Sequence, residues 1–124
     1  KDEHLSKITI VCSGTKMVLE QIRTQLERLV PVRAVSNLTI DGPSIERELA
    51  LIKIVGDDKV WAKCLKVLDQ FHANILDSTK GSYVVEVVDS TKKLDEFINL
   101  MKPLGLVDVS RTGVVAISRG PKAI

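Results

Sequence analysis

The chain has 124 residues, of which 44% are hydrophobic and 27% charged, a composition that predicts a folded protein rather than a disordered one. Its formal net charge of +2 is too small to favour nucleic acid or an anionic membrane as a partner. No apolar run approaches the roughly 20 residues that a membrane-spanning helix needs, and the polar start at Lys1 lacks the pattern of a signal or transit peptide.

The N-terminal third alternates between strand and helix patterns. Residues 7–12 are rich in β-branched side chains and predict a strand, which a Ser-Gly-Thr sequence then breaks. Apolar residues recur at helical spacing over 16–30, and Pro31 ends that helix. A second, weaker strand is predicted over 32–38, and 39–44 has the composition of a loop or linker.

Residues 45–55 form the stretch around which the rest of the chain is organised. A charged start, Glu46-Arg47-Glu48, precedes a run in which apolar residues occupy both alternating faces, interrupted only by Lys53. A strand that is apolar on both faces is typically covered on both sides. We therefore predict a central strand here.

The sequence after this strand predicts a helix, two strands, a second helix and a final strand. A helix with an apolar face over 60–71 follows two aspartates, and strands are predicted over 73–78 and 83–88. The second helix is capped by Ser90-Thr91, and Pro103 and Gly105 end it. Its apolar face is expected to comprise Leu94, Phe97, Ile98 and Met101. The last strand runs over 106–109 and continues over 113–118 after a kink at Thr112-Gly113, and we expect a poorly ordered tail over 119–124.

Residues 48–118 thus have the order βαββαβ, which predicts an α+β fold of the ferredoxin-like type, with the first strand between the third and the fourth. Residues 7–38 have only the order βαβ. Setting Thr15 against Thr91 makes the two regions run in parallel, so 7–38 correspond to the second half of the complete module. We expect either a fragment or a chain whose missing strands another chain supplies, with the core concentrated after Glu48.

Four segments carry a specific family resemblance: LSKITIVCSG, VLEQIRTQLERLVPVRAV, IERELALIKI and DVSRTGVVAISRG. In this order they resemble the regulatory (small) subunit of acetohydroxyacid synthase, also called acetolactate synthase. The resemblance implies a partial ACT domain over 1–42 and a ferredoxin-like C-terminal domain over 43–124. It also implies a homodimer formed through the ACT sheets, located in the cytoplasm of a bacterium or in a plastid or mitochondrion of a eukaryote.

The resemblance further implies a non-catalytic subunit without a cofactor of its own. Family members bind and activate a separate catalytic subunit, which holds thiamine diphosphate, FAD and magnesium. They confer feedback inhibition by valine or related branched-chain amino acids in branched-chain amino acid biosynthesis. Gln21 matches the glutamine of the family's effector site, although by itself it is a common solvated helix residue. Because the loop that supplies the other effector contacts has no counterpart here, we expect this chain alone to bind valine poorly.

The resemblance is densest at two charged segments, and their role has two interpretations. Glu46, Arg47, Glu48 and Arg111 are candidates for contact with the catalytic subunit. Alternatively, the first three are a solvated start of a strand with a surface ion pair worth little. Gly113 most simply permits a bend between two strand segments.

Other kinds of site find little support in the sequence. His4 and His72 are isolated, so no metal-ligand spacing exists, and no phosphate-binding glycine motif occurs. Cys12 and Cys64 fall in strand and helix patterns, so we expect two buried reduced thiols. The alternatives are a generic ACT-like sensing or interaction module with another client, and, more remotely, a small enzyme such as an acylphosphatase.

Overall fold

The computed structural model describes residues 6–29, 32–39 and 42–121, which divide between two compact units. One unit comprises Lys1–Ile45 with Val115–Ile124, and the other comprises Glu46–Val114. The elements are α1 (Lys16–Glu27), β1 (Ser44–Val55), α2 (Asp58–Gln70), β2 (Asn74–Thr79), β3 (Ser82–Asp89), α3 (Thr91–Met101), the 3₁₀ helix η1 (Lys102–Leu104), β4 (Leu106–Arg111) and β5 (Val115–Ser118).

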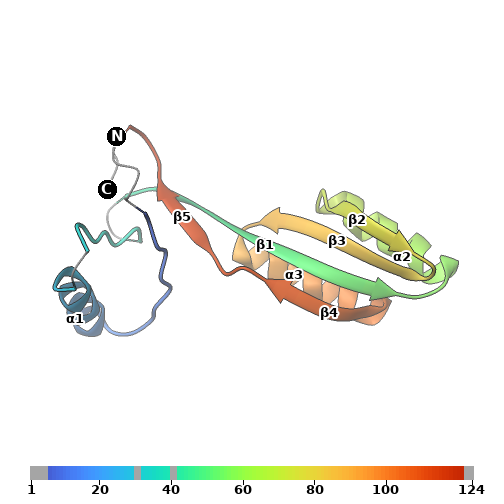
Figure 1. The fold of residues 1–124 in the computed structure, drawn as a ribbon, viewed down its shortest axis with the longest axis horizontal. Helices are drawn as coiled ribbons and strands as arrows, with labels where there is room; N and C mark the ends of the chain where they lie inside the picture. The colour runs from blue at the N-terminus through green and yellow to red at the C-terminus, as the bar shows by residue number, and fades with distance from the viewer. Residues whose placement is uncertain (1–5, 30–31, 40–41, 122–124) are drawn as a thin grey trace. The chain divides into compact units, whose positions relative to one another are not determined.

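The larger unit, Glu46–Val114, is an antiparallel sheet with two helices on one face (Figure 1). The strand order is β2-β3-β1-β4, and β5 pairs with β1 off this path. β1 pairs with β3 from Glu48↔Asp89 to Val55↔Ser82, and with β4 from Ala50↔Arg111 to Ile54↔Leu106. The predicted ferredoxin-like α+β fold is confirmed, including the first strand between the third and the fourth.

The core lies between the sheet and the two helices. Alternate residues of β1, Ala50, Ile52 and Ile54, point towards the helices together with Val85 and Val87 of β3. The helices contribute Cys64, Leu68, Leu94, Phe97, Ile98 and Met101. Every buried residue of the described chain lies at or after Glu48, which confirms the expected position of the core.

Packing of α2 against β3 includes an aromatic pair. The rings of Trp61 and Tyr83 stack with centroids 3.7 Å apart and planes inclined by 7°. Phe71 and Phe97 form a second pair at 5.2 Å, which joins the end of α2 to α3. With few aromatic residues in the chain, these two contacts supply the large flat surfaces of an otherwise aliphatic core.

The prediction that β1 is covered on both faces is wrong. On the face opposite the helices, Leu49 and Leu51 are half-buried, whereas Lys53 and Val55 are exposed. Both helices of this unit pack on the same face, and no second layer covers the other face among the described residues. Alternation of apolar side chains reports which residues share a face, but it does not report whether a layer is present there.

The N-terminal predictions are confirmed for the helix and not for the strands. α1 begins after Thr15, whose hydroxyl accepts from the Val18 N–H, and it ends at Glu27 rather than at residue 30, which lies outside the described residues. No strand forms in the described residues of 7–12 and 32–38. A strand needs a neighbour for its backbone groups, and no strand pairs with these segments among the described residues.

The kink predicted at Thr112-Gly113 is confirmed. Of the tail predicted over 119–124, the structure describes only residues 119–121. Gly113 lies between β4 and β5 with a φ of +83°, a left-handed conformation that glycine adopts readily. Arg119 donates its backbone N–H to Pro43 O at 3.0 Å, and residues 122–124 lie outside the described part of the chain.

Candidate functional site

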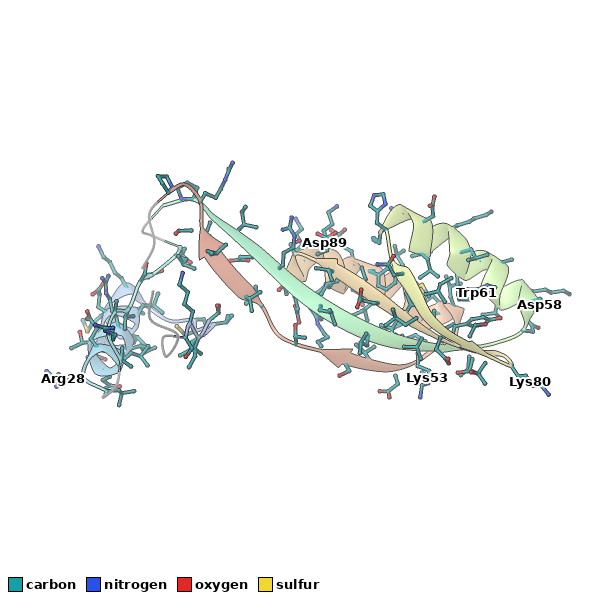
Figure 2. The ribbon with its side chains drawn as sticks, turned by 45° about the horizontal axis from the view of Figure 1, so that its top comes forward. Arg28, Lys53, Asp58, Trp61, Lys80 and Asp89 are labelled. Atoms are coloured by element: carbon teal, nitrogen blue, oxygen red, sulfur yellow. The ribbon has the colours of Figure 1, made fainter. Side chains whose placement is uncertain are left out.

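A buried carboxylate lies on β1 where the pairing of this strand with β3 begins. Glu48 is 5% exposed and is the one charged residue that is buried within the described chain. Because it precedes Ala50 by two positions, its side chain points to the helix-covered face. Its register partner on β3 is Asp89, which Figure 2 labels at the opposite end of the sheet from Lys80.

The carboxylate of Glu48 is held chiefly by Arg111, at the end of β4. Arg111 donates from Nε to Glu48 Oε2 at 2.9 Å and from Nη2 to Glu48 Oε1 at 2.8 Å. Its remaining nitrogen, Nη1, donates to Asp95 Oδ1 on α3 at 2.7 Å. Two parallel bonds from one guanidinium fix the geometry more tightly than a single ion pair does.

Two further donors complete the coordination of Glu48. The hydroxyl of Thr91, the first residue of α3, donates to Oε1 at 2.9 Å, and the backbone N–H of Gly113 donates to Oε2 at 3.2 Å. We call these five residues, Glu48, Thr91, Asp95, Arg111 and Gly113, the Glu48 network. It joins β1, the end of β4, the first half of α3 and the bend before β5.

The electrostatics of the network favour the charged forms of both partners. Hydrogen bonding from Arg111 lowers the pKa of Glu48 from its ordinary value of 4.5, although burial opposes this, and Thr91 and Gly113 lower it further. Hydrogen bonds to Glu48 and Asp95 raise the pKa of Arg111. Each carboxylate oxygen of Glu48 has two donors, which compensates for its removal from water.

The structure brings together two of the four residues predicted at a partner interface. Glu48 and Arg111 form the ion pair, whereas Glu46 and Arg47 are exposed and lie outside the Glu48 network. Arg47 Nη1 donates to Glu46 O at 2.7 Å. The interpretation as a solvated strand start is wrong for Glu48, because β1 turns that side chain under α3. Contact of these residues with a catalytic subunit stays a prediction.

Sequence reasoning missed the other members of the network. Thr91 was expected only as a helix cap, but Ser90 caps α3 by accepting from the Lys93 N–H, which leaves the Thr91 hydroxyl for Glu48. No pattern in the sequence indicated a role for Asp95. A usable signal was the strand parity that places Glu48 on the same face as Ala50 and Ile52, because a charge on a core face requires partners.

Gln21, the predicted effector residue, lies exposed on α1. It borders a shallow hollow whose other lining residues, Met17, Glu20, Thr24, Gln25 and Arg28, belong to the same helix or its C-cap. A surface from a single helix does not enclose a ligand. An effector role of Gln21 stays a prediction.

The cysteines differ from each other in environment. Cys64 is buried, as expected; its Sγ donates to Leu104 O at 3.3 Å, and burial raises the pKa of the thiol. Cys12 is exposed, so the expectation of burial is wrong there, because the strand that would have placed it in a sheet does not form. Within the described chain no group of three or more His, Cys, Asp or Glu residues is arranged to hold a metal ion. In the same residues, no helix is both long and apolar enough to cross a membrane.

Comparison with known proteins relates the sequence and the fold to one family. The family model described as "Small subunit of acetolactate synthase" matches residues 47–120, which include the whole Glu48 network. The crystal structure of an acetolactate synthase small subunit from Thermotoga maritima superposes with a TM-score of 0.75 at 30% identity, covering 89% of this chain and 68% of that chain.

Curated relatives extend the match across the chain. The acetolactate synthase small subunit of Aquifex aeolicus is 36% identical over 119 residues, which are 95% of this chain but only 62% of the relative. The probable acetolactate synthase small subunit of Archaeoglobus fulgidus is 36% identical over 120 residues, or 97% of this chain and 74% of the relative. This chain belongs to the family of acetolactate synthase small subunits.

Proposed function

We propose that this chain acts as a regulatory subunit that binds and activates a catalytic acetolactate synthase subunit and contributes to feedback inhibition by a branched-chain amino acid such as valine. The observation that carries the proposal is the family match over 47–120, together with 36% identity across nearly the whole chain. In this proposal the chain carries no catalytic residues and no cofactor, and the catalytic subunit forms acetolactate.

We propose that the exposed pair beside the Glu48 network contacts the catalytic subunit. Glu46 and Arg47 present opposite charges at the start of β1, next to a part of the strand that Arg111 holds in place through Glu48. Exposed charges on a rigid strand suit an interface, because little backbone freedom is lost on binding. Glu48 and Arg111 would then act by positioning β1.

We propose that residues 1–42 form part of an ACT domain that is completed by further strands and dimerises through its sheet, and that 43–124 form the second domain. The N-terminal segment leaves large apolar side chains in solvent, among them Ile8 at 84%, Val11 at 76% and Met17 at 73% exposure. α1 has no buried residue. Apolar surface of this extent is typical of a segment that packs against a partner.

Reconstitution tests the activating role. Adding the chain to its cognate catalytic subunit should raise the rate of acetolactate formation, measured at saturating substrate. The double variant Glu46→Lys with Arg47→Glu should weaken the activation by raising the concentration of chain needed for half-maximal effect. Lys80→Glu, a charge reversal in the turn at the other end of the sheet, is the matched control (Figure 2). Equal loss in both variants would contradict the proposed interface, and no activation by the wild-type chain would contradict the function.

A calorimetric titration tests the effector role of Gln21. The chain alone should give little or no heat with valine, since Gln21 lies on an open helix surface. A version that carries the complete ACT domain proposed above should bind valine, and Gln21→Ala should then weaken that binding. Clear binding in the micromolar range by the present chain would contradict this expectation.

A further inference from the structure

Both connections between the two compact units border the Glu48 network. The chain passes from one unit to the other between residues 45 and 46, and returns between residues 114 and 115. Glu48 follows the first crossing closely, and Gly113 closely precedes the second. The hydrogen bond from the Gly113 N–H to Glu48 Oε2 therefore ties the two connecting segments to each other inside the larger unit.

One backbone bond and one side-chain bond continue the β1–β4 ladder beyond its last register pair. The paired register of β1 and β4 reaches Ala50↔Arg111. Beyond it, the Thr112 N–H donates to Leu49 O at 3.0 Å, while the Leu49 N–H donates to the Thr112 hydroxyl at 3.1 Å. The Thr112 hydroxyl also contacts Gly113 O at 2.8 Å, at the residue where the backbone turns with positive φ. These bonds lie between the β4 and β5 pairings of β1, and the Gly113 N–H links them to the Glu48 carboxylate.

We propose that the Glu48 network is a clamp that keeps the two connecting strands together where they leave the larger unit, and that the Glu48 carboxylate governs their local opening. The bonds to Glu48 are charge-assisted and converge on one buried group, so the loss of one weakens the others. Opening of Leu49, Thr112 and Gly113 should therefore be a single event. This inference goes beyond the proposed function and does not depend on it.

Residue-resolved amide hydrogen exchange in the whole chain tests the clamp. Glu48→Gln places an amide NH₂ where a carboxylate oxygen accepted two hydrogen bonds, so at least one donor loses its partner. The amides of Leu49, Thr112 and Gly113 should exchange at least about tenfold faster, which is the effect of losing one charged hydrogen bond. Amides of the Ile52↔Val85 pair, inside the sheet, should change much less.

Matched variants separate local opening from general instability. Asp95→Asn weakens only the exposed arm of the network and should change these rates less than about twofold. Phe97→Leu weakens the core without touching the network and should speed exchange evenly throughout the larger unit. Thr91→Val removes one bond to Glu48 and should show the local pattern at smaller size if Glu48→Gln is too unstable to study. An even increase in Glu48→Gln, or no increase at Leu49, Thr112 and Gly113, would overturn the proposal.

Discussion

At the scale of single residues, Glu48 shows how a charge is accommodated on a core face. The strand parity that buries Ala50 and Ile52 also buries Glu48, and water is replaced by a guanidinium, a hydroxyl and a backbone N–H. A pair of this kind adds little net stability over an apolar pair of the same shape, but its disruption is costly because one charge stays behind. Disrupting the Glu48–Arg111 pair should therefore cost more stability than disrupting an exposed ion pair such as Lys93–Glu96.

Arg111→Ala should lower the free energy of unfolding by about 2–4 kcal/mol, somewhat less than for a fully buried pair, because the Arg111 side chain is 28% exposed. It leaves the Glu48 carboxylate buried without its main partner. Asp95→Asn, which affects the exposed bond of the same arginine, should cost less than about 1 kcal/mol. Urea denaturation measures both values, and equal costs would contradict the asymmetry.

The pH dependence of stability should contain a contribution from Glu48. Its pKa is lowered in the folded state, so the unfolded chain binds more protons and stability rises with pH. The contribution is fully present above the ordinary value of 4.5 and is lost as the pH falls through the lowered folded pKa. Urea denaturation between pH 3 and 7 should show the gap between wild type and Glu48→Gln shrinking below about pH 4.5. A gap that stays constant with pH would contradict this.

At the scale of elements, the sequence correctly predicted the helices and strands whose packing partners lie in the same chain. β1, β3, α2 and α3 carry clear alternation or helical spacing, and each finds its packing partner among residues 46–114. The segments 7–12 and 32–38 have a composition suited to strands, but no strand pairs with them among the described residues. Composition alone therefore gave a wrong prediction for these segments. The Glu48 network could not be predicted in full because the residues that donate to Glu48 lie 43 to 65 positions from it in the sequence.

Gly105, in the turn between η1 and β4, is required there for two separate reasons, its positive φ and the lack of space for a Cβ. Gly105 has a φ of +99°, and an added Cβ would lie 2.5 Å from Val55 O. Gly113 has a φ of +83° but open space around it. Gly105→Ala should therefore destabilise the chain by more than about 1 kcal/mol and by more than Gly113→Ala does, as measured by urea denaturation. A larger loss for Gly113→Ala would show that steric contact at Gly105 is relieved by movement of β1.

At the scale of the whole molecule, apolar burial is concentrated in one of the two units. Within the described part of the chain, the buried hydrophobic residues lie between Ala50 and Met101, and α1 contributes none. Cooperative stability arises from such a core, so the N-terminal segment should add little to it. A fragment comprising residues 44–121 should unfold in urea with nearly the midpoint of the whole chain. Loss of the cooperative transition in this fragment would contradict that expectation.

The aromatic residues that give optical signals, including the stacked pair of Trp61 and Tyr83, all lie in the larger unit. The chain has one tryptophan, one tyrosine and two phenylalanines, and all four lie between residues 61 and 97. Intrinsic fluorescence and near-ultraviolet dichroism therefore observe the larger unit alone, while residues 1–45 are silent. An amino acid or protein that binds only the silent segment leaves these signals unchanged unless its effect travels along the connecting strands. Emission from Trp61 is thus a ready detector of communication between the two ends of the chain.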